Sequence, residues 1–213
     1  MQRIRRRIVA AAIVLCPSAA FAQSPKAATY IADEEVKKVN NQPGIDRTIK
    51  VVDIGNENLA VGIIHRGPTG GAGRGAASTG GAATAAAPGE PCGEQASSSP
   101  ASGLVAGITH DSQTEGYVIV SGGGTLVTGG HIVNGRKSSA DSEVTKVLNG
   151  PSCSGAIAGA DVVKRAVKTG DIVIIPAGVP HGWIEITDHV DYLSIRPSDH
   201  VLQAGYVNPA IKN

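Results

Sequence analysis

Apolar and polar side chains alternate over short stretches along much of this sequence, and turn-forming residues separate the stretches. Residues 49–54 and 59–64 form the first such pair, with a Gly-Asn turn between them. More stretches of this kind lie in the C-terminal half, at 117–120, 125–127, 160–167, 171–175, 183–187 and 190–196. The three glycines at 122–124 are interpreted as a turn. Many short strands joined by such turns predict an all-β sandwich or barrel.

One short helix is expected ahead of the strands, over residues 29–40. Its acidic residues gather in the early turns, and Lys37 and Lys38 lie in the later ones, which complements the helix dipole. Pro43 and Gly44 then end the helix.

Two stretches lack the alternating pattern. Residues 67–103 consist mainly of Gly, Ala, Ser, Thr and Pro, and so few large apolar side chains cannot offset the entropy of ordering. We interpret this stretch as a surface loop inserted between two strands, with a lid over a site as the alternative. A second long polar segment is expected between Ile132 and Gly159.

The N-terminus has the pattern of a secretory signal peptide. Four arginines lie within the first seven residues, an apolar run covers 8–20, and Ala20 and Ala22 provide the small residues before a cleavage site. A membrane anchor is the alternative, but the run of about 13 residues is short of the roughly 20 that span a bilayer. We therefore expect residues 1–22 to be removed and the mature chain to be secreted or periplasmic, with no membrane association after cleavage.

Charge argues against nucleic acid as a partner. Without the four arginines of the signal, 15 of the 19 basic residues remain against 18 acidic ones, a net charge of −3. No basic cluster remains, whereas binding to phosphates requires one.

Two cysteines remain in the mature chain, Cys92 and Cys153, because Cys16 leaves with the signal. Each lies in a stretch rich in Gly, Pro and Ser. An exported pair can form a disulfide, and the sequence leaves this open. No Cys-x-x-Cys is present, so neither a zinc ribbon nor a thioredoxin-like site is expected.

The most specific pattern lies at residues 170–181. It reads Gly, five residues, Pro, one residue, Gly, two residues, His, and ends at His181. Upstream, His110 is followed by Glu115 and then, six residues further on, by Gly122. No serine hydrolase motif, phosphate-binding loop or dinucleotide fingerprint is present.

These two motifs resemble those of the cupin superfamily over residues 108–185. The resemblance implies a single cupin-type β-barrel (a double-stranded β-helix or jelly roll) at 49–213, preceded by an N-terminal segment at 23–48 with the short helix. It also implies a homodimer.

The resemblance further implies a divalent metal ion, Fe, Mn, Zn, Ni or Cu, bound by His110, Glu115 and His181. Two imidazoles and one carboxylate leave coordination positions open for a substrate or O₂. The pattern has another His two residues before His110, where this chain has Ile108. Gln113 or Asp111 is a candidate for the missing fourth ligand.

The function that these residues favour is that of an exported metal-dependent enzyme acting on a small organic molecule, with the reaction left open. Tyr117, two residues after Glu115, would share its inward face and assist proton transfer. Trp183 would line the pocket or belong to the core. The alternatives are a non-catalytic binder of a sugar or another small ligand, and a dimeric barrel without metal. The other histidines, His65, His131, His189 and His200, are expected at the surface or at strand edges.

Overall fold

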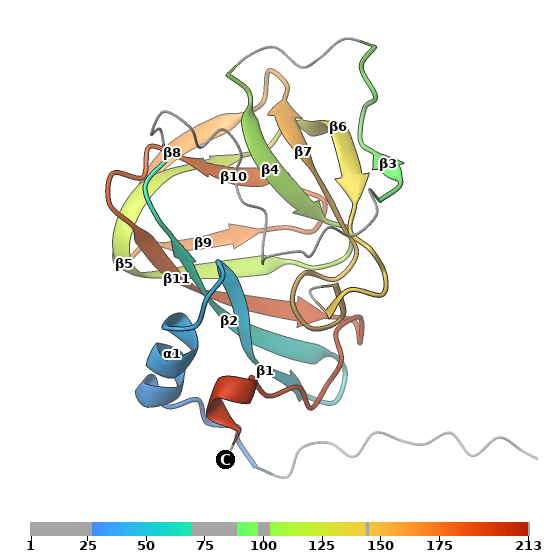
Figure 1. Ribbon diagram of the computed structural model, residues 1–213. Coiled ribbons are helices and arrows are strands. Elements are labelled where there is room, and N and C mark those ends of the chain that lie inside the picture. Colours follow the sequence, from blue (N-terminus) through green and yellow to red (C-terminus); the bar gives the residue numbers. More distant parts are fainter. Residues whose placement is uncertain (1–26, 70–88, 98–102, 144, 213) are drawn as a thin grey trace, which may run out of the picture.

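The computed structural model describes residues 27–69, 89–97, 103–143 and 145–212 (Figure 1). The predicted signal peptide at 1–22 and most of the 67–103 loop therefore lie outside the described residues. Within the described ranges, no helix is both long enough and apolar enough to span a bilayer.

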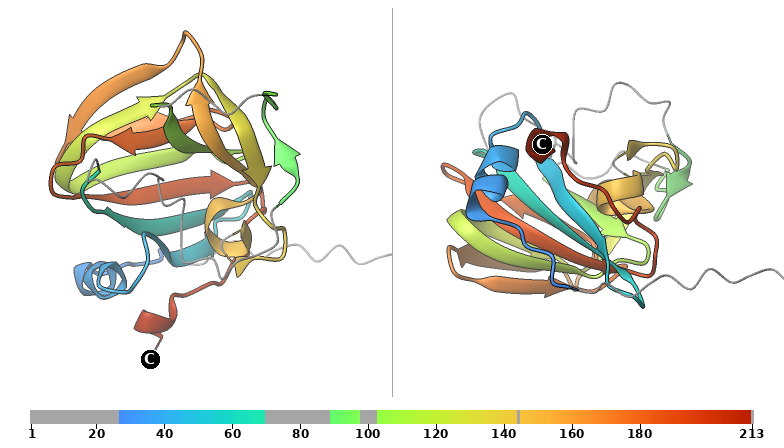
Figure 2. Two further views of the ribbon diagram at one scale, coloured as in Figure 1. Left: turned by 45° about the horizontal axis from the view of Figure 1, so that its top comes forward. Right: turned by 90° about the horizontal axis from the view of Figure 1, so that it is seen from below.

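Strands dominate the fold, and all ladders between them are antiparallel. The strands are β1 (Asp46–Asp53), β2 (Asn58–Arg66), β3 (Pro91–Cys92), β4 (Val105–His110), β5 (Glu115–Thr128), β6 (His131–Lys137), β7 (Ser152–Ala158), β8 (Val163–Lys168), β9 (Ile172–Ile175), β10 (His181–Ile184) and β11 (Val190–Ser198). Their order is β1-β2-β11-β5-β10-β4-β7-β6-β3, and β8 and β9 both pair with β5. The sheet curls into one barrel, which confirms the predicted all-β class (Figure 2).

The helix α1 (Asp33–Asn40) confirms the predicted helix but begins later than expected. The carboxylate of Glu35 accepts a hydrogen bond from the backbone N–H of Ala32, which fixes the start of the helix. Val39 is fully buried against Ile49 and Ile63, so α1 covers the outer face of β1 and β2. The C-terminal 3₁₀ turn η2 (Pro209–Ile211) lies beside α1 (Figure 2).

The predicted turn at 122–124 is wrong, because β5 runs unbroken through these glycines for 14 residues. Its first part lies between β11 and β9, and its last part lies between β10 and β8. Gly122 has φ +67°, and a Cβ there would lie 2.0 Å from the carbonyl oxygen of His189. The glycines therefore bend a strand around the barrel instead of reversing it.

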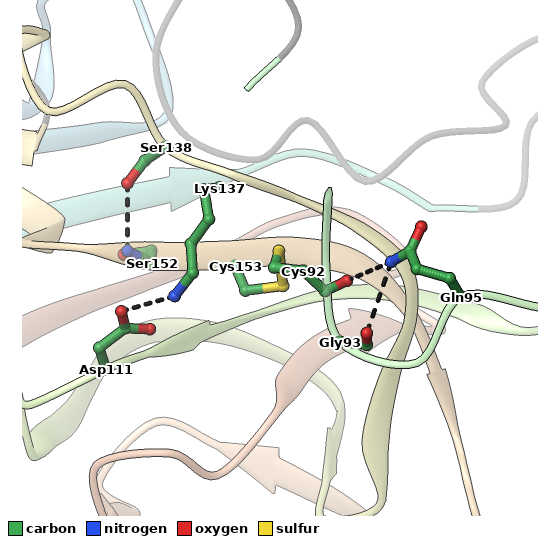
Figure 3. Close-up of a disulfide and its surroundings, with 8 residues drawn as sticks. All are labelled: Cys92, Gly93, Gln95, Asp111, Lys137, Ser138, Ser152 and Cys153. Atoms are coloured by element: carbon green, nitrogen blue, oxygen red, sulfur yellow. Dashed lines mark hydrogen bonds and ion pairs between the residues drawn. A yellow bond between two sulfur atoms is a disulfide. The ribbon is translucent and has the colours of Figure 1, made fainter. Parts of the chain in front are cut away.

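The prediction of a long polar segment between Ile132 and Gly159 is also wrong. It contains β6, a π-helical turn η1 (Thr145–Asn149) and β7. Small residues concealed β7, where Gly155 packs so closely that a Cβ would lie 2.6 Å from Cγ2 of Ile132. Cys153 on β7 forms a disulfide with Cys92 on β3, so the open question about this pair is settled in favour of the bond (Figure 3).

The core inside the barrel is built around three neighbouring aromatic side chains. The ring centroids of Tyr117 and Tyr192 are 4.2 Å apart, and those of Trp183 and Tyr192 are 5.4 Å apart. Aliphatic side chains such as Ile119 and Leu126 pack around them. Burial of aromatic side chains contributes strongly to stability. The few aromatic residues of this chain are therefore used where they stabilise the fold most, in the core.

Candidate metal centre

Three strands bring the predicted ligands together inside the barrel. His110 is the last residue of β4, Glu115 is the first of β5, and His181 is the first of β10. In one continuous strand an odd spacing would place the side chains of His110 and Glu115 on opposite faces of the sheet. Here the chain bends between the end of β4 and the start of β5, so both side chains can point into the barrel. The hydrogen bond from the backbone N–H of Gly178 to the carbonyl of His110 joins the two motifs directly.

The potential ligand atoms of these residues face one another. The Nε2 atoms of His110 and His181 lie 3.4 Å and 3.2 Å from Oε2 of Glu115. All three atoms lie within 4.8 Å of one another. The side chains are between 1% and 5% exposed, so almost no water reaches them.

The outer nitrogens of both imidazoles are held by hydrogen bonds that determine where the ring proton lies. Nδ1 of His181 lies 3.1 Å from the carbonyl oxygen of Val179, which can only accept a hydrogen bond. Nδ1 of His110 lies 3.0 Å from the hydroxyl of Ser152, and that hydroxyl donates to the carbonyl of Gly150. We therefore assign the proton to Nδ1 in both rings, which leaves a lone pair on each Nε2.

Glu115 is held as a carboxylate by groups on its other side. Its Oε1 accepts hydrogen bonds from Nε of Arg196 at 2.8 Å and from the hydroxyl of Ser194 at 2.5 Å. Burial alone raises the pKa of Glu115, but the charge of Arg196 outweighs it. The pKa therefore lies well below its ordinary value. Oε2 remains directed at the two imidazoles.

This arrangement fits a bound cation. Three atoms with lone pairs at such short separations repel one another unless positive charge lies among them. Burial is the largest influence on His110 and lowers its pKa, which disfavours the imidazolium form as the source of that charge. Two neutral imidazoles and one carboxylate are a donor set used for Fe(II), Zn²⁺ and related ions. The group can therefore hold a divalent metal ion.

Tyr117 also contacts the group. It is 2% exposed, and its hydroxyl donates a hydrogen bond of 3.0 Å to Oε2 of Glu115. Burial, together with the charge of Glu115, raises the pKa of Tyr117 well above its ordinary value. The phenol is therefore a proton donor at neutral pH, and its part in catalysis stays a prediction.

The candidates for a fourth ligand differ in position. Asp111 is half-exposed and pairs with Nζ of Lys137 at 2.6 Å, so it lies outside the group (Figure 3). Gln113 is 1% exposed, and neither amide atom finds a hydrogen-bond partner among the described residues. Its role as a ligand stays a prediction. Ile108, which replaces the expected His, pairs with His181 across the β4–β10 ladder.

Sequence reasoning did not identify Arg196 and Ser194 as residues of the site. Both lie on β11, where every second residue is buried, so they share the inward face of that strand. This alternation could be detected in the sequence. However, serine and arginine usually face solvent, so they are not recognised as inward residues unless a buried carboxylate is known to lie opposite them. The four histidines expected at the surface have side chains between 31% and 50% exposed.

Comparisons with known proteins were made by sequence and by structure. No family model and no curated protein matches the sequence. A solved structure of an uncharacterized Klebsiella pneumoniae protein with a double-stranded beta-helix domain matches at a TM-score of 0.36 and 15% identity, covering 83% of this chain and 94% of that one.

Two solved enzyme structures also match. One is a recombinant oxalate oxidase in complex with glycolate, at a TM-score of 0.36 and 14% identity, covering 76% of this chain. The other is the DMSP lyase DddQ from Ruegeria pomeroyi, at a TM-score of 0.36 and 11% identity, covering 80% of this chain. The matches span 55% and 54% of those two chains, so this chain corresponds to about half of each.

Proposed function

We propose that this chain, whose fold and motifs are those of the cupin superfamily, is an exported metalloenzyme that acts on a small organic molecule. His110, Glu115 and His181 would hold a divalent metal ion. The observation that carries the proposal is the convergence of three lone-pair atoms, each fixed from behind by its own hydrogen bonds. Such support is typical of metal ligands, because it sets the orientation and the protonation state of each one.

Each residue of the centre has a role that follows from its contacts. Val179 and Ser152 hold the two imidazoles with Nε2 directed inward. Arg196 holds one carboxylate oxygen and leaves the other for the ion. Tyr117 holds a proton at its hydroxyl, next to that second oxygen. A divalent ion at this position supplies Lewis acidity for a bound substrate.

Elemental analysis of the mature protein, purified from its own compartment, tests the proposal. We expect one equivalent of Fe, Mn, Zn, Ni or Cu per chain, which dialysis against a chelator removes and reconstitution restores. His110→Ala and His181→Ala should each abolish retention of the metal. His131→Ala, whose side chain is 50% exposed, is the matched control and should retain it. A wild-type protein without stoichiometric metal, before and after reconstitution, contradicts the proposal.

A second candidate is a barrel that binds a small ligand without metal. The ion pair of Glu115 with Arg196 favours this candidate, because it already neutralises the buried carboxylate. A metal-independent binder should show ligand-induced stabilisation without turnover, and it should keep its ligand after His110→Ala and His181→Ala. The enzyme should lose its activity in both variants.

Export is part of the proposal as well. The signal pattern at 1–22 and the Cys92–Cys153 disulfide both support a compartment outside the cytoplasm, where disulfides persist. Sequencing the N-terminus of the native protein should give Gln23 as the first residue. An intact N-terminus together with free thiols contradicts export. The proposed homodimer is tested by sedimentation of the same sample.

A further inference from the structure

A second group of polar side chains lies on the outer face of the barrel, where β5 carries a β-bulge. The odd-numbered residues 115–119 of β5 are buried inside the barrel, so Ser121 would follow them inward in a regular strand. The register with β11 shifts at this point, because the ladder skips Val120 and Ser121 pairs with Asp191. Asp191 lies between two buried residues of β11 and faces outward. Since paired side chains share a face, the bulge turns Ser121 outward as well.

A histidine and an aspartate from the connection between β10 and β11 lie next to this serine. The hydroxyl oxygen of Ser121 is 2.8 Å from Nε2 of His189. Nδ1 of His189 is 2.7 Å from Oδ2 of Asp188. A carboxylate only accepts hydrogen bonds, so we assign the ring proton to Nδ1, which leaves Nε2 to accept the hydroxyl proton. A serine, an imidazole and a carboxylate joined in this order are the arrangement that activates a serine as a nucleophile.

The position of the imidazole is fixed by its neighbours. Gly122 has φ +67°, and a Cβ there would lie 2.0 Å from the carbonyl oxygen of His189 and 3.1 Å from its Cδ2. A glycine at 122 is therefore what allows the histidine to approach β5. On the other side, the ring of His65 on β2 stacks on that of His189, with centroids 6.0 Å apart. Nδ1 of His65 is in turn 2.6 Å from Oδ1 of Asp191, which orients the stacked ring.

An open cleft of about 380 Å³ adjoins this group. His189 and Asp188 line it, together with the glycines at 122–124. As far as the described residues define the lining, it includes a second carboxylate, that of Glu185, but neither lysine nor arginine. The cleft has the size of a small-molecule site, and its charge favours a neutral or cationic substrate over an anionic one.

We propose that Ser121, His189 and Asp188 form a second site, which hydrolyses esters of small carboxylic acids with neutral or cationic alcohols or phenols. Oγ of Ser121 attacks the carbonyl carbon while Nε2 of His189 takes the hydroxyl proton. That proton passes to the departing alcohol as its C–O bond breaks, which leaves the acyl group on the serine. Water, deprotonated by His189, then attacks the acyl carbon, releases the acid and restores the hydroxyl. Asp188 is a positioning residue that holds the tautomer of the imidazole.

The proposal does not depend on the Gly-x-Ser-x-Gly pattern that the sequence lacks. In that pattern a tight turn between a strand and a helix exposes the serine. Here a β-bulge exposes Ser121, and such groups are recognised by geometry and not by sequence position. The reaction also goes beyond the proposed metal function, because none of its steps involves the metal centre.

The purified protein is tested with p-nitrophenyl acetate, as isolated and after treatment with a chelator. We expect an acetyl group on Ser121, located by mass spectrometry of peptides from the acid-quenched protein, and release of p-nitrophenol over many turnovers. Both should be unchanged by the chelator, and loss of the activity on chelation overturns the proposal. Methyl 4-acetoxybenzoate should be deacetylated at least about fivefold faster than the anionic 4-acetoxybenzoate. Equal rates overturn the substrate preference.

Variants then identify the reacting residues. Ser121→Ala should remove the acetyl group, and both Ser121→Ala and His189→Gln should slow the release of p-nitrophenol at least about tenfold. Ser139→Ala, at an exposed serine, is the matched control and should react like the wild type. Acetyl groups distributed over lysines and other serines, with an unchanged rate in Ser121→Ala, overturn the proposal.

Asp188→Asn tests the positioning residue at a side chain that is 88% exposed, so folding does not depend on it. Acetylation should slow only about threefold, because solvent screens an exposed carboxylate. The acid limb of the pH–rate profile should move to lower pH, since an amide does not stabilise the imidazolium form. The other titratable groups beside the imidazole, His65 on β2 and Asp191 on β11, are unchanged in this variant. A profile identical to that of the wild type overturns the role of Asp188.

Discussion

The ion pair between Glu115 and Arg196 should be strongly coupled in the metal-free protein. Arg196→Met leaves the carboxylate with the hydroxyls of Ser194 and Tyr117 but without a counter-charge. Glu115→Gln leaves the guanidinium with the carbonyl of Leu148. Removing one partner of a buried pair typically destabilises a protein by about 3–5 kcal/mol, because the other charge remains buried and unpaired. We expect about 3 kcal/mol for Arg196→Met and about 4 kcal/mol for Glu115→Gln.

The double variant should lose less than either single variant, about 2 kcal/mol, because neither charge then remains. Urea unfolding of the four proteins at pH 7, with chelator present and the disulfide intact, gives the coupling energy from the cycle. The exposed pair Lys137–Asp111 is the control, and its coupling should stay below about 1 kcal/mol. Effects of Glu115→Gln and Arg196→Met that add within about 0.5 kcal/mol would refute the reasoning.

Three further results are expected. Reducing the disulfide, whose cysteines are 61 positions apart, should lower the free energy of unfolding by about 4 kcal/mol in urea titrations, and a loss below about 1 kcal/mol would contradict this. Gln113→Met should stabilise the chelator-treated protein by about 1 kcal/mol, because it removes a buried amide that has no hydrogen-bond partner in the described part of the chain; a loss of stability would show that the amide is satisfied. Acidification should destabilise the metal-free protein in two steps. The pKa values of His110 and Glu115 are lowered in the folded state, so the unfolded chain takes up protons first, below about pH 6.5 and again below about pH 4.5. Stability that stays constant from pH 7 to pH 4 would contradict the assignment.

The parts of the molecule that the sequence predicted are those encoded locally. A Gly-Asp turn, a buried strand, a Pro-Ala-Gly turn and a histidine follow one another within residues 170–181, so the position of His181 could be derived from neighbouring residues alone. The helix and most of the short strands were recognisable for the same reason. Exact ends were less predictable, as the late start of α1 shows, because they depend on caps such as Glu35.

The parts that were missed depend on contacts between distant residues. Arg196 and Glu115 are 81 positions apart, and no local sequence pattern near either residue predicts that they form a pair. The glycines of β5 were predicted as a turn because the close approach of His189, from the connection between β10 and β11, to Gly122 is not visible in the local sequence. Strand β7 was missed because it is built mostly from small residues, which carry little pattern of their own.

Of the strands in the described residues, β11 comes last along the chain but lies between β2 and β5 in the sheet. While the ribosome extends the chain, both of these strands present an open edge, and neither finds its final neighbour until residues 190–198 have emerged. Unpaired edges favour intermolecular pairing, so a chain that lacks β11 should be prone to aggregate. Transcripts with a premature stop before residue 190 should therefore yield aggregated or degraded polypeptide and not a smaller soluble barrel.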